Sequence, residues 1–149
     1  MQRSANENSP VVLELEGLTR SYFQGSREIR VLDHSNARLH AGEAVALVGP
    51  SGAGKSTLLH IAGLLETPDA GRVLVAGEDC ARMNDAARTA VRRSQMGFVY
   101  QFHQLLPEFS ALENVVMPQL IRGRSMRDAR QRARELLDLL GLGNRAEHR

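Results

Sequence analysis

The chain of 149 residues has the size of one domain, and its 42% hydrophobic and 24% charged residues are typical of a globular protein. No apolar run approaches the roughly 18 to 20 residues that cross a bilayer, and the polar start, Met1 to Ser9, lacks the apolar core of a secretory signal. We therefore expect a cytoplasmic protein. The lone Cys80 excludes an internal disulfide and has no metal-ligand spacing around it, so we expect it to be a small core residue.

The net charge of +2 is unevenly distributed along the chain. Between Arg82 and Arg134 there are ten arginines and four acidic residues. Such a basic segment can face nucleic acid, an anionic membrane surface or an acidic partner, or it can simply be solvated. Aromatic residues that would stack on bases are absent between Met117 and Arg149, so we expect no nucleic-acid partner.

Short apolar segments separated by turns predict that the first part of the chain is rich in strands. After a polar tail at residues 1–10, apolar residues at 11–15 and 18–23 predict two strands, and Gln24-Gly25-Ser26 predicts a turn. Further strands are expected at residues 29–32, 37–39, 45–48, 72–75 and 96–100. This order predicts an antiparallel β region followed by parallel core strands.

Helices are predicted from apolar spacing and from residues that can cap them. An apolar helix over residues 55–65 should end at the turn Thr67-Pro-Asp-Ala-Gly71. Asn84 can cap a second helix that runs to about Gln95. A helical arm should follow these elements.

The helical arm consists of two further helices with Ser-x-x-acid starts. Ser110 pairs with Glu113, and Ser125 pairs with Asp128. Gly141 is placed to end the last helix. The apolar face of that helix carries Ala129, Ala133, Leu136, Leu137 and Leu140.

Residues 49–57 lie between a predicted strand and a predicted helix and match Gly-x-x-x-x-Gly-Lys-Ser, the pattern of a phosphate-binding loop. The glycines allow a tight turn that brings backbone N–H groups close to phosphate oxygens, and the helix N-terminus faces the same anion. Lys55, the only lysine in the chain, supplies charge for the β- and γ-phosphates, and Ser56 supplies a hydroxyl ligand for Mg²⁺. The nucleotide-binding candidates are Gly49, Pro50, Ser51, Gly52, Ala53, Gly54, Lys55, Ser56 and Thr57.

Strand, phosphate loop and helix in this order predict a P-loop α/β fold, which leaves kinases, GTPases and transport ATPases open. Two other stretches narrow the choice: Tyr22 lies 33 residues before Lys55, and Gly-Phe-Val-Tyr-Gln-Phe-His-Gln-Leu-Leu-Pro-Glu-Phe begins at Gly97. Together with the phosphate loop and the turn at 63–71, these stretches resemble the ATP-binding subunits of ABC transporters. The segment at 100–120 is most similar to the lipoprotein-releasing members, and the resemblance covers about residues 12–149.

The resemblance implies ATP and Mg²⁺ as cofactors. By it, Tyr22 is the aromatic residue that stacks on adenine, although a plain strand-end tyrosine is the alternative. Gln101 corresponds to the Q-loop glutamine, whose amide oxygen can reach Mg²⁺ or the attacking water, so the metal-binding candidates are Ser56 and Gln101. For His103 we favour a surface or partner contact over a catalytic role.

The fold implied is a P-loop NTPase of ABC type: an N-terminal antiparallel β region, parallel core strands and a helical arm. The β region and P-loop core should occupy about residues 11–80, and the Q-loop and helical arm about residues 84–149. The family's signature, Walker B strand, catalytic Glu and switch His are expected after Arg149. We therefore expect a truncated chain with an incomplete sheet and no catalytic residue of its own.

The function implied is that of the energy-coupling ATP hydrolase of a transporter that releases lipoproteins from the inner membrane toward the outer membrane. The partners implied are integral membrane subunits of the Lol C/E type and a second copy of the ATPase subunit. The subunit would be peripheral, on the cytoplasmic face of the bacterial inner membrane. Four alternatives remain open at this point: a macrolide-type exporter, a cell-division ATPase, a nucleotide-binding fragment that does not hydrolyse ATP and, from the basic segment alone, a nucleic-acid-associated ABC ATPase.

Overall fold

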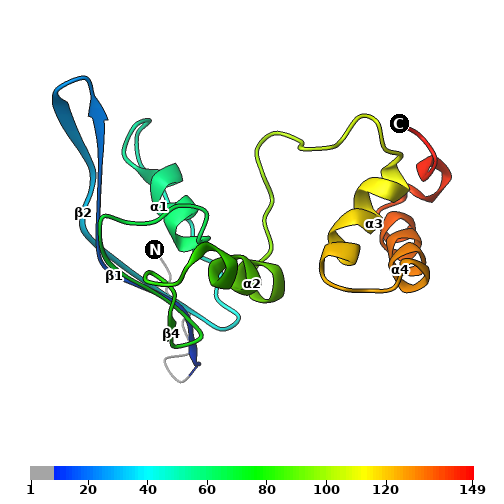
Figure 1. Cartoon of the computed structure of the whole chain (residues 1–149), viewed down its shortest axis with the longest axis horizontal. Helices are drawn as coiled ribbons and strands as arrows, with labels where there is room; N and C mark the ends of the chain where they lie inside the picture. Colours follow the sequence, from blue (N-terminus) through cyan, green and yellow to red (C-terminus); the bar gives the residue numbers. More distant parts are fainter. Residues whose placement is uncertain (1–8) are drawn as a thin grey trace. The chain divides into compact units, whose positions relative to one another are not determined.

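The computed structural model describes residues 9–149, so the polar tail expected at residues 1–10 lies almost wholly outside the described residues. Two units are formed, one ending at Met96 and the other running from Gly97 to Arg149 (Figure 1). No helix among residues 9–149 is both long enough and apolar enough to cross a membrane.

A four-stranded antiparallel sheet in the order β2-β1-β3-β4 forms the centre of the first unit. Its strands are β1 (Val11–Gln24), β2 (Arg27–His40), β3 (Ala70–Val75) and β4 (Glu78–Asp79). The hairpin of β1 and β2 confirms the strands and the turn predicted before residue 40. The two strands predicted at residues 11–15 and 18–23 form one continuous strand with a bulge near Gly17. At the bulge the Gly17 N–H donates to Asn36 Oδ1 at 2.7 Å.

Two helices, α1 (Lys55–Ala62) and α2 (Asp85–Gln95), accompany this sheet (Figure 1). Asn84 caps α2 as predicted, since its side-chain oxygen accepts the Ala87 N–H at 2.9 Å. Cys80 is fully buried, as expected, and burial raises the pKa of its thiol. The buried core consists of Leu15, Leu18, Leu32, Ile61, Leu64, Val73, Val75, Cys80 and Val91.

The prediction of parallel core strands at residues 45–48 and 96–100 is wrong for the described residues. Neither segment is hydrogen-bonded into the sheet, and Val45 and Val99 are 63% and 102% exposed. Their apolar composition suits a strand buried on both faces, but a strand also needs a neighbour that pairs with its backbone. No such neighbour is present in the part of the chain that the structure describes.

The first helix ends at Ala62, three residues earlier than predicted, because the chain closes it with a Schellman motif. The Leu64 N–H donates to Ile61 O at 2.9 Å, and the Leu65 N–H donates to His60 O at 2.8 Å. Leu64 takes the left-handed position, φ 58°, that glycine usually occupies there. Its side chain is only 2% exposed, so burial in the core offsets the backbone strain.

The second unit contains α3 (Ala111–Ile121), α4 (Met126–Leu139) and a short 3₁₀ helix (Gly143–Arg145). Both predicted N-caps are confirmed: Ser110 accepts the Glu113 N–H at 3.2 Å, and Ser125 accepts the Asp128 N–H at 3.1 Å. Gly141 ends α4 in the left-handed conformation, φ 70°. The core between α3 and α4 consists of Leu112, Val116, Ala129, Ala133 and Leu137.

The apolar face predicted for α4 is correct at three positions and wrong at one. Ala129, Ala133 and Leu137 are buried against α3, and Leu136 is half-buried. Leu140, however, is 71% exposed. The reason is that Leu140 is the C-cap, after which the chain turns away at Gly141 and the helical spacing no longer applies.

Candidate functional site

The phosphate-binding loop at residues 49–57 has a backbone that only glycine adopts without strain at two positions. Gly52 and Gly54 both have φ of +80°. Lys55 folds back over the loop, and its Nζ donates to Gly49 O at 2.8 Å and to Pro50 O at 2.6 Å. The ammonium group is therefore held at the mouth of the loop, where a phosphate would meet it.

The loop leads directly into the N-terminus of α1. Gly54 is the N-cap, and because glycine has no side chain, it makes no side-chain cap hydrogen bond to the first N–H groups of the helix. The first turn of α1 contains no acidic residue. Ser56 lies in this turn and is exposed. Backbone N–H groups without a side-chain cap, the positive helix end, an ammonium and a hydroxyl thus lie in consecutive residues. This donor set fits a polyphosphate with its Mg²⁺.

Tyr22, the predicted adenine-stacking residue, lies in the same unit as the loop. Its ring carries the Arg20 guanidinium over one face, with 4.9 Å from Arg20 Cζ to the ring centroid. Its hydroxyl donates to Glu66 Oε1 at 2.7 Å and lies 3.5 Å from Thr57 Oγ1. The structure thus brings Tyr22 to the last residue of the phosphate loop.

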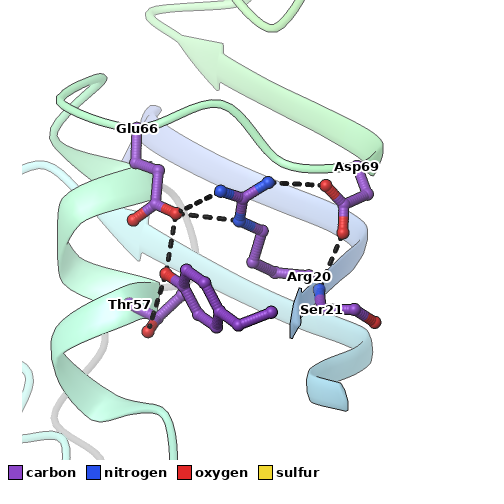
Figure 2. Close-up of polar contacts among 6 residues, drawn as sticks. Arg20, Ser21, Thr57, Glu66 and Asp69 are labelled. Atoms are coloured by element: carbon purple, nitrogen blue, oxygen red, sulfur yellow. Dashed lines mark hydrogen bonds and ion pairs between the residues drawn. The ribbon is translucent and has the colours of Figure 1, made fainter. Parts of the chain in front are cut away.

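The Arg20 side chain is held by two carboxylates that follow α1 in the chain (Figure 2). Its Nε donates to Glu66 Oε1 at 2.8 Å, and its Nη2 forms an ion pair with the same oxygen at 2.8 Å. Its Nη1 donates to Asp69 Oδ1 at 2.6 Å. The other Asp69 oxygen accepts the Ser21 N–H at 2.7 Å. The Ser21 amide and then the Arg20 guanidinium hold the pKa of Asp69 below its usual range.

Gln101 and His103 belong to the second unit. Both are exposed and lie before α3, in a segment without regular secondary structure. The predicted role of Gln101 at Mg²⁺ therefore stays a prediction.

Three residues near Tyr22 were not predicted from the sequence as part of the site: Arg20, Glu66 and Asp69. Glu66 and Asp69 are 46 and 49 residues from Arg20 along the chain. No motif joins them, and the one local signal was the turn at residues 67–71, which was assigned only as a helix end.

Comparison with known proteins decides among the classes of P-loop protein. Residues 32–149 match the family model described as ABC transporter. The chain belongs to the ABC transporter family. Members of this family bind ATP with Mg²⁺, and its ATPases hydrolyse ATP.

Curated relatives within the family carry the name lipoprotein-releasing system ATP-binding protein LolD. The protein from Ruegeria sp. (strain TM1040) is 61% identical over 142 residues, which are 95% of this chain and 63% of that protein. The protein from Granulibacter bethesdensis is 59% identical over 136 residues, 91% of this chain and 59% of that protein. The chain thus spans about three-fifths of the length of these relatives.

Solved structures with the same fold include the ATP-binding cassette MJ0796. A dimeric post-hydrolysis state bound to ADP and Pi matches with a TM-score of 0.84 at 35% identity, over 92% of this chain and 61% of that chain. A second dimeric structure of MJ0796, a bacterial ABC transporter cassette, has the same TM-score at 36% identity. The predicted fold class, a P-loop NTPase of ABC type, is thereby confirmed.

Proposed function

We propose that this chain is the nucleotide-binding part of the energy-coupling ATPase subunit of an ABC transporter that releases lipoproteins from the inner membrane. The observation that carries the proposal is the phosphate loop, with Lys55 bonded back to its carbonyl groups and a helix start without a side-chain cap directly after it. The specific transporter is supported by relatives of about 60% identity that bear the LolD name.

In this proposal each part of the site has a separate task. The backbone of residues 49–57 binds the phosphates, and Lys55 moves from the Gly49 and Pro50 carbonyls to the β- and γ-phosphates. Ser56 would hold Mg²⁺, which supplies charge neutralisation on the phosphates when bound. Tyr22 would stack on the adenine.

The proposed partners are a second copy of the subunit and integral membrane subunits of the Lol C/E type. The dimeric cassettes among the structural neighbours support a second copy, and membership of the ABC transporter family supports membrane subunits in general. The subunit would lie peripherally on the cytoplasmic face of the inner membrane, and ATP hydrolysis would be an activity of the whole protein.

The test of this proposal is Lys55→Ala in the whole protein assembled with its membrane subunits. We expect loss of ATP hydrolysis, weaker ATP binding and loss of lipoprotein release from proteoliposomes, because the chain has no other lysine. The matched control is Arg27→Ala, which removes an exposed cation at the hairpin end. Undiminished turnover in Lys55→Ala would contradict the phosphate-loop assignment, whereas ATP hydrolysis without lipoprotein release in the wild type would contradict the transport assignment alone.

A further inference from the structure

Arg20 and Tyr22 are two positions apart on β1, so their side chains leave the same face of the sheet. The guanidinium of Arg20 lies over the Tyr22 ring at 4.9 Å. This contact covers one face of the ring, while Tyr22 as a whole keeps 38% of its surface exposed. The residue thus keeps exposed surface at which a further flat group could bind.

The guanidinium cannot move freely over that ring because two carboxylates hold it. Glu66 accepts the Nε–H and forms an ion pair with Nη2, and Asp69 accepts an N–H of Nη1. Both carboxylates come from the segment that joins α1 to β3 (Figure 2). The planar fork of an arginine fits such paired acceptors with little loss of side-chain entropy. The Arg20 side chain is therefore fixed before any ligand arrives.

Glu66 also fixes the other end of Tyr22. Its Oε1 accepts the Tyr22 hydroxyl at 2.7 Å, and it is the same oxygen that accepts Arg20. The Tyr22 hydroxyl lies 3.5 Å from Thr57 Oγ1, at the end of the phosphate loop. One carboxylate thus holds the tyrosine ring at a set place beside the phosphate site.

We propose that Arg20, held by Glu66 and Asp69, is a positioning residue that orients the Tyr22 ring for the nucleotide base. This inference rests on the proposed role of Tyr22 in adenine binding. The gain is preorganisation: a ring already fixed in its binding orientation loses little side-chain freedom when the base stacks on it. The phosphate groups, which are bound by the loop and Lys55, should not depend on Arg20.

Other ion pairs on the same sheet provide a matched comparison. Arg38 pairs with Glu14, and Arg72 pairs with Glu16. Both arginine side chains are more than half exposed, and among the described residues it is Arg20, not Arg38 or Arg72, that lies over the Tyr22 ring. Arg38→Ala therefore removes an arginine–carboxylate pair of this sheet without touching Tyr22.

The experiment compares ATP with inorganic triphosphate, both with Mg²⁺, by titration calorimetry of the whole subunit. Arg20→Ala should weaken ATP binding about two- to tenfold, the cost of immobilising one side chain, and should leave triphosphate binding unchanged. The double variant Arg20→Ala with Tyr22→Ala should bind ATP no more weakly than Tyr22→Ala alone. Arg38→Ala should behave as the wild type.

Other results of these titrations would separate the base-binding role of Tyr22 from the positioning role of Arg20. If Tyr22→Ala leaves ATP affinity unchanged, the role of Tyr22 in base binding is wrong. If Tyr22→Ala weakens ATP binding but Arg20→Ala does not, only the positioning role of Arg20 is overturned. An equal loss of ATP and triphosphate binding in Arg20→Ala also overturns it, because Arg20 would then act through the loop. If Arg20→Ala fails to fold, Tyr22→Phe, which removes only the hydroxyl bonded to Glu66, tests the same network.

Discussion

A Cβ on Gly54 would lie 2.8 Å from the backbone carbonyl oxygen of Val31. The same atom would lie 2.9 Å from Val31 Cγ1 and 3.2 Å from Leu32 Cδ2. Gly54, the last glycine of the phosphate loop, thus packs directly against β2. The strand sets the position of the loop, and through it the start of α1.

Gly54→Ala should abolish ATP binding and destabilise the protein. The left-handed φ alone costs roughly 1–2 kcal/mol for a residue with a Cβ, and the contact with Val31 forces the loop off the strand. Gly52→Ala is the matched control, since Gly52 has the same φ of +80° but no atom of residues 9–149 lies within 4 Å of the added carbon, apart from its chain neighbours. We expect calorimetry and thermal unfolding to show a smaller loss for Gly52→Ala. Equal effects of the two substitutions would show that the close approach to Val31 has no part.

Local signals in the sequence predicted local structure well. The cap of α2 at Asn84 and the capping box at Ser110 each join groups three residues apart. The hairpin turn at Gly25 is equally local. Such contacts depend only on neighbouring residues, so they can be predicted from one sequence.

Structure that depends on distant residues was not predicted. Residues 45–48 have the composition of a strand but no paired neighbour among the described residues. Glu66 and Asp69, which hold the Arg20 side chain, lie 46 and 49 residues after it in the chain, and no sequence spacing rule connects them. The phosphate loop could be predicted because its function is carried by a contiguous motif, whereas the support of Tyr22 exists only once the sheet has formed.

Leu137 and Leu139 of α4 provide a test of the second unit's core. Leu137 is 4% exposed and Leu139 is 80% exposed. Leu137→Ala should lower the free energy of unfolding by about 2–5 kcal/mol, because it opens a cavity against α3. Leu139→Ala should change it by no more than about 0.5 kcal/mol. Urea unfolding of the whole subunit measures both, and similar values for the two variants would contradict the assigned core.

Ser110 makes the N-cap of α3, and its substitution should destabilise that helix. Its hydroxyl accepts the Glu113 N–H, while the Glu113 carboxylate accepts the Ser110 N–H at 2.8 Å. The residue is 5% exposed, so water replaces the lost hydrogen bond poorly. Ser110→Ala should cost about 0.5–2 kcal/mol in urea unfolding, and Ser110→Asp should retain most of the stability. A loss in Ser110→Asp as large as that in Ser110→Ala would argue against capping as the cause.

Asp69 should make the stability of the protein depend on pH. The folded-state pKa of Asp69 is lowered, first by the Ser21 N–H and second by Arg20. A carboxyl with a lowered folded-state pKa stabilises the fold above its unfolded-state pKa, about 3.9, and this contribution is lost as the pH falls toward the folded-state value. Wild type should therefore be more stable than Asp69→Asn at pH 7, and the difference should shrink below about pH 4.

The variant Asp69→Asn suits this test because its amide oxygen can still accept the Ser21 N–H, so the main change is the loss of charge. In an Arg20→Ala background the effect of Asp69→Asn on stability should become smaller but persist, since the Ser21 amide is the larger cause of the lowered pKa. Urea unfolding between pH 7 and about pH 3, in wild type, the two single variants and the double variant, measures these differences. A difference that does not change with pH would mean that the charge on Asp69 does not stabilise the fold.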